Sequence, residues 1–335
     1  MELLNNVSLK SFVTFGVEAH CDHLYRVEDI EELKLAAQYL ENPLILGGGS
    51  NVLPIGDIHR NVLKIELKGI EIEEEEGKDP LVHFGAGENW HSIVLWALDR
   101  NLGGIENLSL IPGTIGAAPM QNIGAYGVEL ESVFHQLEAI EIGTGNIRRF
   151  NKQACKFGYR DSVFKNEVKG QYIITGVTLK LTRDHILNTS YGAIQDILKD
   201  RGISKPSIHE VSDAVIAIRQ SKLPDPAVIG NAGSFFKNPV ITKQQFDIIK
   251  ESHPALPGYP ADTEHMKIPA GWLIENAGWK GKSLGNVGCY EKQALVLVNH
   301  GGATGAEVWS LATQIINSVE ENFNIRLSPE VNIWN

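Results

Sequence analysis

Apolar residues recur along this chain with two different periods, and the period predicts which kind of element each stretch forms. Between Glu28 and Leu40 they lie three and four positions apart, which predicts an amphipathic helix that Pro43 ends. The same reasoning predicts further helices at 90–100, 191–201, 208–218, 242–251, 270–276 and 304–322.

Short apolar or alternating runs predict strands. They lie at 44–46, 62–67, 70–76, 81–84, 136–142, 147–150, 172–181, 294–299 and 326–334. The runs at 136–142 and 147–150 are predicted to form a hairpin across the turn from Gly143 to Asn146. The run at 70–76 becomes acidic towards its end, which favours a solvated edge strand or hairpin.

The length of 335 residues exceeds what one hydrophobic core usually holds, so two or three domains are expected. We place one boundary near Gly69. The segment from Leu223 to Pro226 carries two prolines, which predicts a hinge between domains. The sequence shows no internal repeat.

Composition and charge indicate the class of protein and exclude two classes of partner. A hydrophobic content of 43% and a charged content of 21% are typical of a soluble globular protein. The formal net charge of −11 would repel nucleic acid and anionic membrane surfaces, so we expect neither as a partner. An anionic substrate would need local basic residues.

Cysteine usage and the absence of long apolar runs indicate the compartment. Cys21, Cys155 and Cys289 lie far apart and form no CxxC pair, which indicates neither a disulfide framework nor a zinc site. The chain shows no basic leader followed by an apolar core, and no apolar run long enough to span a membrane. We therefore expect a cytoplasmic protein without a bound metal.

The first candidate for ligand chemistry is the glycine turn at 47–51, which follows the apolar run at 44–46. Its residues are Gly47, Gly48, Gly49, Ser50 and Asn51. Successive glycines leave the backbone uncovered, and consecutive N–H groups in such a turn can form a nest for a phosphate or pyrophosphate. An ordinary glycine-rich hairpin turn explains these residues equally well. The sequence has no G-x-G-x-x-G dinucleotide fingerprint. In the pattern that starts at Gly47, Val52 stands in place of the third glycine, and in the pattern that starts at Gly85, Trp90 does.

The second candidate is the apolar loop from Ile111 to Gly127, which is rich in glycine and nearly free of charge. This composition favours neither a helix nor a strand, yet it is too apolar for a solvated loop. We expect the loop to pack against something flat. A tight buried loop is the alternative, and composition alone favours it slightly.

Six short strings in a consistent order carry a resemblance that runs nearly from end to end. They are GGGSN, IPGTIGAAPMQNIGAYG, FGYRDS, SKLPDP, NAGSFFKNP and the terminal SPEV. Together they resemble the UDP-N-acetylenolpyruvoylglucosamine reductase family, also called UDP-N-acetylmuramate dehydrogenases, which are flavoenzymes of bacterial peptidoglycan precursor synthesis. The loop at Tyr191-Gly192 resembles the family's longer, type I form.

The resemblance implies an α+β protein with an FAD-binding fold of the vanillyl-alcohol-oxidase (PCMH) type, together with a smaller α+β substrate-binding domain. We expect residues 1–68 and 69–224 to form the two FAD-binding subdomains. Residues 225–324 would form the substrate-binding domain, and 325–335 a C-terminal strand that returns to the FAD-binding region. The family precedent favours a monomer in the bacterial cytoplasm.

The resemblance also implies FAD as the cofactor and NADPH as the reductant. The glycine turn at 47–51 matches the family's pyrophosphate contacts. Part of the apolar loop matches the contacts to the isoalloxazine ring, namely Ile111, Pro112, Gly113, Ile123, Gly124, Ala125 and Tyr126. A planar ring on a desolvated surface would explain why so uncharged a loop exists.

In the family, NADPH reduces FAD and leaves, and UDP-N-acetylglucosamine enolpyruvate takes its place. A hydride then moves to C3 of the substrate and a proton to C2, which gives UDP-N-acetylmuramate. Arg160 matches the family residue that pairs with the substrate carboxylate, Ser234 the proton donor and Glu330 an electrostatic partner. Without the family, a surface turn, a turn serine and a solvated glutamate would be the simpler interpretations.

Five further residues match positions that bind the substrate in the family, namely Tyr191, Arg219, Lys222, Asn238 and Tyr259. Lys222 and Arg219 are the expected diphosphate partners in an otherwise acidic protein. Two alternatives stay open. An oxidase of the same fold would share the glycine turn but would not need the later strings, and a non-enzymatic sugar-nucleotide-binding protein would not need the apolar loop.

Overall fold

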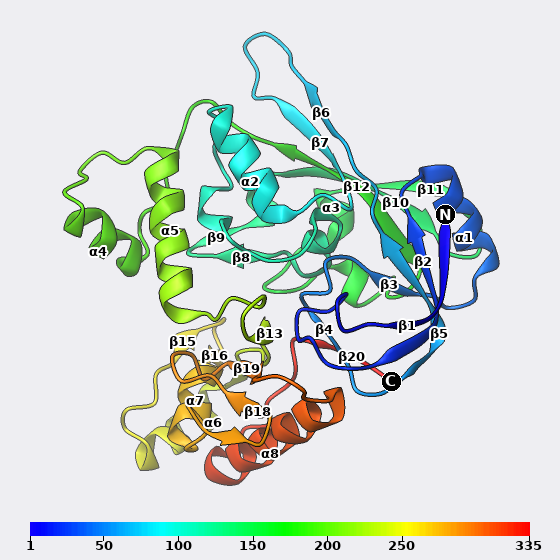
Figure 1. Ribbon diagram of the computed structural model, residues 1–335. Coiled ribbons are helices and arrows are strands. Elements are labelled where there is room, and N and C mark those ends of the chain that lie inside the picture. Colours follow the sequence, from blue (N-terminus) through cyan, green and yellow to red (C-terminus); the bar gives the residue numbers. More distant parts are fainter. The chain divides into compact units, whose positions relative to one another are not determined.

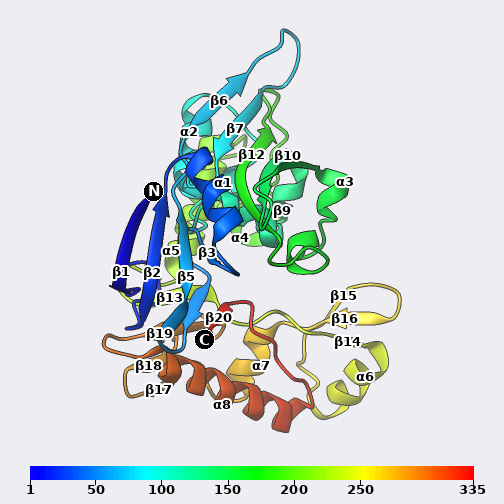
Figure 2. The same cartoon turned by 90° about the vertical axis from the view of Figure 1, so that its right-hand side faces the viewer.

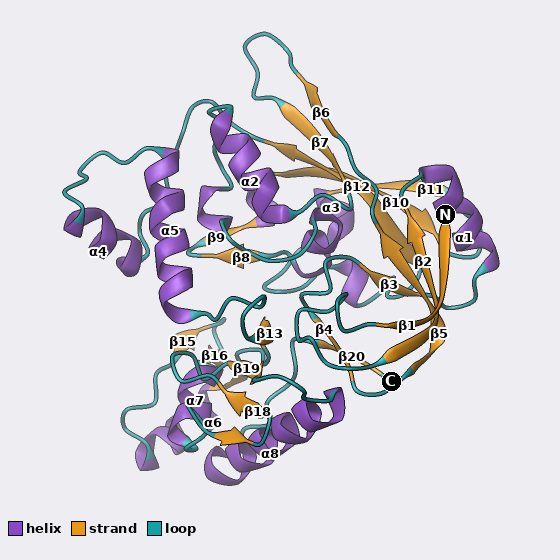
Figure 3. Cartoon of the chain, viewed as in Figure 1, coloured by secondary structure: helices purple, strands orange, loops and turns teal.

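The computed structural model describes residues 1–335, which divide into two compact units. Unit 1 comprises Met1–Val7, Cys21–Gly48 and His59–Ser221, and unit 2 comprises Ser8–His20, Gly49–Ile58 and Lys222–Asn335. Both units combine helices with strands, which confirms the predicted α+β class (Figure 3). One boundary falls inside the glycine turn, and another falls directly before the proline-rich segment at 223–226.

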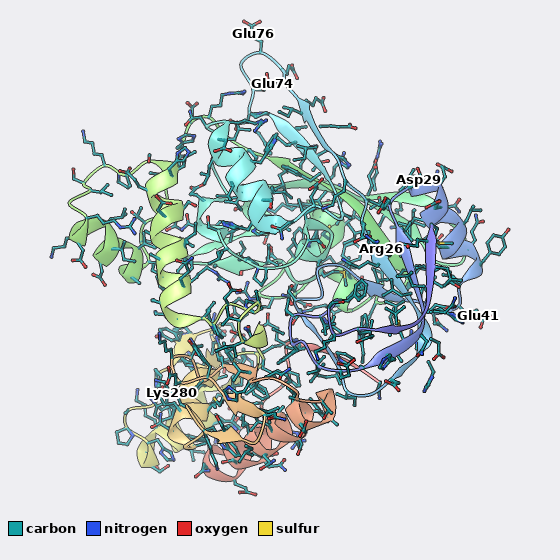
Figure 4. All side chains as sticks on the ribbon, in the orientation of Figure 1. Arg26, Asp29, Glu41, Glu74, Glu76 and Lys280 are labelled. Atoms are coloured by element: carbon teal, nitrogen blue, oxygen red, sulfur yellow. The ribbon has the colours of Figure 1, made fainter.

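Unit 1 contains a four-stranded sheet that leads the chain into the glycine turn (Figures 1 and 2). Its strand order is β1 (Glu2–Ser8), β2 (His20–Val27), β5 (Ile58–Ile65), β3 (Leu44–Leu46). Helix α1 (Ile30–Tyr39) begins at its N-cap, Asp29 (Figure 4). Its apolar face shares a core with Leu63 and Ile65 of β5. Strand β3 pairs in parallel with β5, so Leu46 at the end of β3 lies opposite Lys64.

A five-stranded antiparallel sheet forms the rest of the unit 1 framework. Its order is β11 (Ile147–Asn151), β10 (Phe134–Glu141), β12 (Tyr172–Lys180), β7 (Leu81–Gly85), β6 (Ile70–Glu73). Strand β6 is an edge strand, and its acidic continuation with Glu74 and Glu76 forms the tip of the β6–β7 hairpin (Figure 4). This confirms the predicted solvated edge. Helix α2 (Trp90–Asp99) packs into the same core as Phe84 and Val177.

Three more helices and several short elements complete unit 1. Helices α4 (Gly192–Asp200) and α5 (Ile208–Lys222) share a small core of their own, and α3 (Lys152–Cys155) is a single turn (Figure 1). The short elements are β8 (Gly124–Ala125), β9 (Val128–Glu129) and the 3₁₀ helices η1 (Glu106–Leu108), η2 (Ile115–Gln121), η3 (Leu130–Ser132) and η4 (Val163–Lys165). The prediction for α5 ended at 218, one turn too early, because the polar residues after Ile218 continue the helix until shortly before Pro224.

Unit 2 carries three small sheets. The first has the strand order β13 (Gly230–Ser234), β19 (Val296–Asn299), β18 (Val287–Cys289), β17 (Ser283–Leu284). The second has the order β14 (Val240–Thr242), β16 (His265–Lys267), β15 (Tyr259–Pro260), and the third pairs β20 (Asn332–Trp334) with β4 (Val52–Pro54). The helices are α6 (Lys243–Ser252), α7 (Ala270–Asn276) and α8 (Gly305–Phe323), which begins with a capping box of Thr304 and Glu307. None of the helices in the molecule combines the length and apolar character that a membrane crossing requires.

The C-terminal strand returns to the end of the glycine turn. Strand β20 pairs in parallel with β4, and the Asn332 N–H donates to the Asn51 carbonyl at 3.0 Å. The predicted strand at 326–334 is therefore present but shorter, since Pro329 lacks the N–H that a regular ladder needs. The sequence did not predict β1, β2, β4, β8, β9 and β13 to β18, because their residues show weak alternation, are very few, or are interrupted by glycine and proline.

Candidate active site

The glycine turn is held by close backbone packing within each unit. In unit 1, a Cβ on Gly48 would lie 2.7 Å from the Gly113 Cα, and a Cβ on Gly47 would lie 2.7 Å from Thr114 Oγ1. In unit 2, Gly49 has a φ of +63°, and a Cβ there would lie 1.8 Å from the Phe12 carbonyl oxygen. The structure thus brings the glycine turn against the first residues of the apolar loop, and contacts inside the protein already require glycine.

The same turn leaves backbone donors available. Among the hydrogen bonds of residues 1–335, none has the backbone N–H of Gly48, Gly49 or Ser50 as its donor. A left-handed residue such as Gly49 within a run of this kind bends successive N–H groups into a nest. These donors fit an anionic group such as the pyrophosphate of FAD, and the Lys64 Nζ donates to the Gly47 carbonyl beside them at 2.5 Å.

The apolar loop is attached to the start of α2. The Trp90 N–H donates to the Gly113 carbonyl at 3.0 Å, and the Trp90 indole N–H donates to the Leu108 carbonyl at 2.8 Å. The expectation of neither helix nor strand was only partly right, because η2 and the two-residue strand β8 lie within the loop. Small residues allow these tight turns without supporting a longer helix.

Several residues in or beside the candidate site have a left-handed backbone conformation. Nine residues other than glycine have positive φ, and five of them are asparagines, which tolerate this conformation. The other four are Leu110, Tyr126, Lys156 and Arg160. Three of these four lie in or beside the predicted flavin and substrate contacts, and residues held in such conformations cluster at functional sites.

Arg160 lies against the predicted flavin contacts. It occupies the corner of a tight turn that hydrogen bonds between Gly158 and Asp161 close on both sides, and its φ is +54°. Its guanidinium Nη2 donates to the Gly124 carbonyl at 2.5 Å. The structure therefore places Arg160 next to Gly124 of the apolar loop, two positions that are 36 residues apart in sequence.

Tyr126, Tyr191 and Arg219 form a cluster in unit 1. The rings of Tyr126 and Tyr191 meet edge to face with centroids 5.1 Å apart, and the Arg219 guanidinium interacts with the Tyr126 hydroxyl. Arg219 Nε also donates to the Leu110 carbonyl at 3.2 Å. Burial lowers the pKa of Arg219 and raises the pKa of Tyr126. A predicted cofactor contact and two predicted substrate contacts thus meet on one surface.

Ser234 and Glu330 lie on adjacent backbone segments in unit 2. The Glu330 N–H donates to the Phe235 carbonyl at 2.8 Å, and Phe236 forms a bridge with Pro329. Phe235 and Phe236 are buried, whereas the Ser234 side chain between them and Gly233 is exposed. Two residues almost a hundred positions apart are therefore brought together by pairing of the segment after β13 with the segment before β20.

The remaining predicted substrate contacts lie in unit 2 as well. Asn238 Oδ1 accepts the Ala270 N–H at 2.9 Å, so this side chain caps α7 through its oxygen. Tyr259 in β15 is 58% exposed. Lys222, at the end of α5, is exposed and has no carboxylate within 4.0 Å. The ligand contacts of these residues stay predictions.

Two side chains beside the candidate site were missed at the sequence level. Lys64 interrupts the apolar run at 62–67, and His91 follows the N-cap Asn89 of α2. A lysine within a strand could have drawn attention, because a charge that points inwards needs a partner. His91 carried no such signal, since one histidine near a helix start has no distinctive spacing.

Comparisons with known proteins agree along the whole chain. The family model described as the FAD binding domain matches residues 23–151, and the model for the UDP-N-acetylenolpyruvoylglucosamine reductase C-terminal domain matches residues 225–334. The UDP-N-acetylenolpyruvoylglucosamine reductase of Flavobacterium johnsoniae is 50% identical over 336 residues, covering 99% of this chain and 100% of that protein. The Pseudomonas aeruginosa reductase is 47% identical over 338 residues, covering 100% and 99%.

A solved structure extends the similarity to the fold. The UDP-N-acetylenolpyruvylglucosamine reductase of Thermus caldophilus matches with a TM-score of 0.70 and 25% identity, and the match covers 100% of both chains. Sequence and fold therefore agree with the FAD-binding architecture that the glycine turn and the apolar loop indicate. This chain belongs to the UDP-N-acetylenolpyruvoylglucosamine reductase family.

Proposed function

We propose that this protein is an FAD-dependent reductase that converts UDP-N-acetylglucosamine enolpyruvate to UDP-N-acetylmuramate in peptidoglycan precursor synthesis, with NADPH as the reductant. The observation that carries this proposal is the identity of 45–50% over almost the full length to relatives that all bear the same reductase name. We also propose the division into 1–68, 69–224, 225–324 and 325–335, and a monomer in the bacterial cytoplasm.

The proposed cofactor site uses backbone donors and uncharged surface. The N–H groups of Gly48, Gly49 and Ser50 would hold the FAD pyrophosphate, and the segments 111–113 and 123–126 would lie against the isoalloxazine ring. When bound, FAD supplies the hydride that the substrate receives at C3. The protein contributes orientation, exclusion of water, stabilisation of charge and one proton.

Arg160 and Ser234 would act on the two ends of the enolpyruvyl group. The guanidinium of Arg160 would pair with the carboxylate and stabilise the negative charge that grows there when C3 accepts a hydride. The Ser234 hydroxyl makes no hydrogen bond to another residue, and it would donate its proton to C2. Glu330, on the segment next to Ser234, would be a hydrogen-bonding partner of the substrate.

The proposed substrate contacts have side chains that suit a sugar nucleotide. Lys222 suits a diphosphate because no carboxylate neutralises its charge. Asn238 retains its amide donors after its oxygen has capped α7. Tyr259 and Tyr191 are about half exposed, at 58% and 47%, and so can contact a ligand.

One experiment separates this function from its alternatives. The purified protein is examined for flavin absorbance, and NADPH consumption is then followed without oxygen, with and without the enolpyruvyl sugar nucleotide. The proposed reductase is yellow and turns over only when both substrates are present. When oxygen is then admitted, an oxidase would consume it without the sugar nucleotide. A non-enzymatic binding protein would be colourless and would leave NADPH unchanged.

A further inference from the structure

The segment 108–113, which leads into the predicted flavin contacts, is fastened by main-chain hydrogen bonds to two helices. Trp90 of α2 holds its two ends, through the Leu108 and Gly113 carbonyls. In the middle, the Leu110 N–H donates to His91 Nδ1 at 3.0 Å, and the Leu110 carbonyl accepts from Arg219 Nε at 3.2 Å. Both polar backbone groups of one residue are therefore bound by side chains from α2 and α5.

Leu110 also has a backbone conformation that needs such support. Its φ is +59°, a left-handed conformation that clashes with the Cβ of ordinary residues and is uncommon outside asparagine and glycine. A leucine side chain offers no local hydrogen bond to stabilise this conformation. The two bonds from His91 and Arg219 therefore account for why Leu110 keeps it, directly before Ile111 and Pro112.

The hydrogen bond defines the state of His91. An imidazole nitrogen that accepts an N–H cannot carry a proton, so Nδ1 is bare and Nε2 is the protonated nitrogen in the neutral ring. Arg219 is the charged group that faces His91 from α5, and burial together with this guanidinium lowers the pKa of His91 below its ordinary value of 6.5. If Nδ1 were protonated, two donors would face each other and the bond to Leu110 would be lost.

We propose that His91 is a positioning residue of this reductase: its neutral imidazole, together with Arg219, fixes Leu110 in the left-handed conformation and so sets how Ile111 and Pro112 meet the bound flavin. The inference rests on the proposed function, because the flavin contact of this segment belongs to it. As a consequence, activity should fall at acidic pH because protonation of His91 breaks its hydrogen bond to Leu110. This acid limb would not come from a group that exchanges protons with the substrate.

The test compares three variants with the wild type. His91→Ala removes the acceptor, whereas His91→Asn replaces it with an amide oxygen at a similar reach that does not titrate. His135→Ala is the matched control, because His135 is an exposed residue of β10 in the same unit. Each protein is studied as the full chain, with FAD and after FAD removal.

The first measurement is hydrogen exchange at the Leu110 amide in the FAD-free protein. The wild type and His91→Asn should protect this amide at neutral pH, and His91→Ala should lose roughly tenfold or more of that protection, the scale of one buried hydrogen bond. The protection in the wild type should fall as the pH drops through a midpoint below 6.5, whereas protection in His91→Asn should not. Equal protection in His91→Ala and the wild type would overturn the inference.

The second measurement follows the bound flavin. His91→Ala should shift the visible flavin spectrum and slow flavin reduction by NADPH roughly tenfold at neutral pH. His91→Asn should have the wild-type flavin spectrum and reduction rate but lack the acid limb. His135→Ala should match the wild type in spectrum, rate and pH dependence. An acid limb that is unchanged in His91→Asn would refute the positioning role. If none of the proteins bound FAD, the proposed function would fail, and the exchange measurement would still decide whether His91 holds Leu110.

Discussion

Lys64 carries a half-buried ammonium group for which the protein supplies no opposite charge within 4.0 Å. Its hydrogen bond goes to the Gly47 carbonyl in the glycine turn. Burial is the main cause that lowers the pKa of Lys64, and Glu66 acts in the opposite direction. A charge placed beside an anion-binding turn at a cost in solvation is consistent with a role in holding the pyrophosphate.

Replacing Lys64 with methionine should therefore have opposite effects on the empty and the loaded protein. The pKa of Lys64 is lower in the folded than in the unfolded chain, so the folded state gains stability as the pH rises between these two values, and the charge is a burden at neutral pH. We expect Lys64→Met without FAD to melt at the same or a higher temperature. Its dissociation constant for FAD should rise at least tenfold, about 1.5–3 kcal/mol for a charge-assisted contact.

Thermal melts of the FAD-free proteins and FAD fluorescence titrations measure both effects. Lys169→Met is a suitable control, because Lys169 is an exposed residue of the same unit. A lower melting temperature with unchanged FAD affinity would instead assign Lys64 a purely structural role.

Ser234 separates the two half-reactions of the proposed cycle. The residue is assigned only to the protonation of C2, so Ser234→Ala should be reduced by NADPH at close to the normal rate. Oxidation by the enolpyruvyl substrate should slow by roughly 10²–10⁴-fold, the usual loss when a positioned general acid is removed. Stopped-flow absorbance of the flavin follows both steps in one sample. Equal slowing of both steps would make Ser234 a structural residue and direct the search for the donor to Glu330.

At the scale of elements, the glycine turn and the apolar loop behave as one packed pair. The 2.7 Å approach of a Gly48 Cβ to the Gly113 Cα is a backbone contact, so no side-chain rotation can relieve it. Glycine at this position therefore allows the two loops to pack closely. It affects ligand binding indirectly, because this packing sets the shape of the turn.

Gly48→Ala should consequently both destabilise the protein and reduce its FAD content. Overpacking of this kind typically costs about 1–3 kcal/mol, and displacement of either loop would spoil the arrangement of donors. Gly56→Ala is the matched control, because a Cβ at Gly56 meets no atom within 4 Å and its φ is not positive. Denaturant unfolding and the ratio of flavin to protein absorbance measure the two quantities. A stable, fully flavin-loaded Gly48→Ala would contradict the packing argument.

The elements differ in how well the sequence predicted them. Helices such as α1 and α8 have an apolar face and a capping residue, so local signals located them to within a few residues. Strand β13 was not predicted and β20 was predicted too long, because their partners lie far away in sequence and their residues include glycine or follow proline. In these strands, long-range pairing decides the structure.

At the scale of the whole molecule, FAD binding and folding should be linked. A ligand that binds only the folded protein stabilises it in proportion to the logarithm of its concentration, about 2.7 kcal/mol at one hundred times the dissociation constant. We expect the melting temperature of FAD-free protein to rise steadily with added FAD. Riboflavin, which has the ring but not the pyrophosphate, should have little effect if the glycine turn is the main anchor. An equal shift with riboflavin would move the anchor to the apolar loop.

The sequence alone determined the family, because six strings in order are a property of the chain and do not depend on knowing contacts. It also located the glycine turn and the apolar loop, since runs of glycine and uncharged residues can be recognised from neighbouring residues in the sequence. The tertiary structure decided which residues meet: Gly48 with Gly113, Arg160 with Gly124, Glu330 with Phe235, and His91 with Leu110. The reason is physical. Local preference acts over a few residues, whereas these contacts join residues from 19 to 95 positions apart and are selected by packing and by the need to pair buried polar groups.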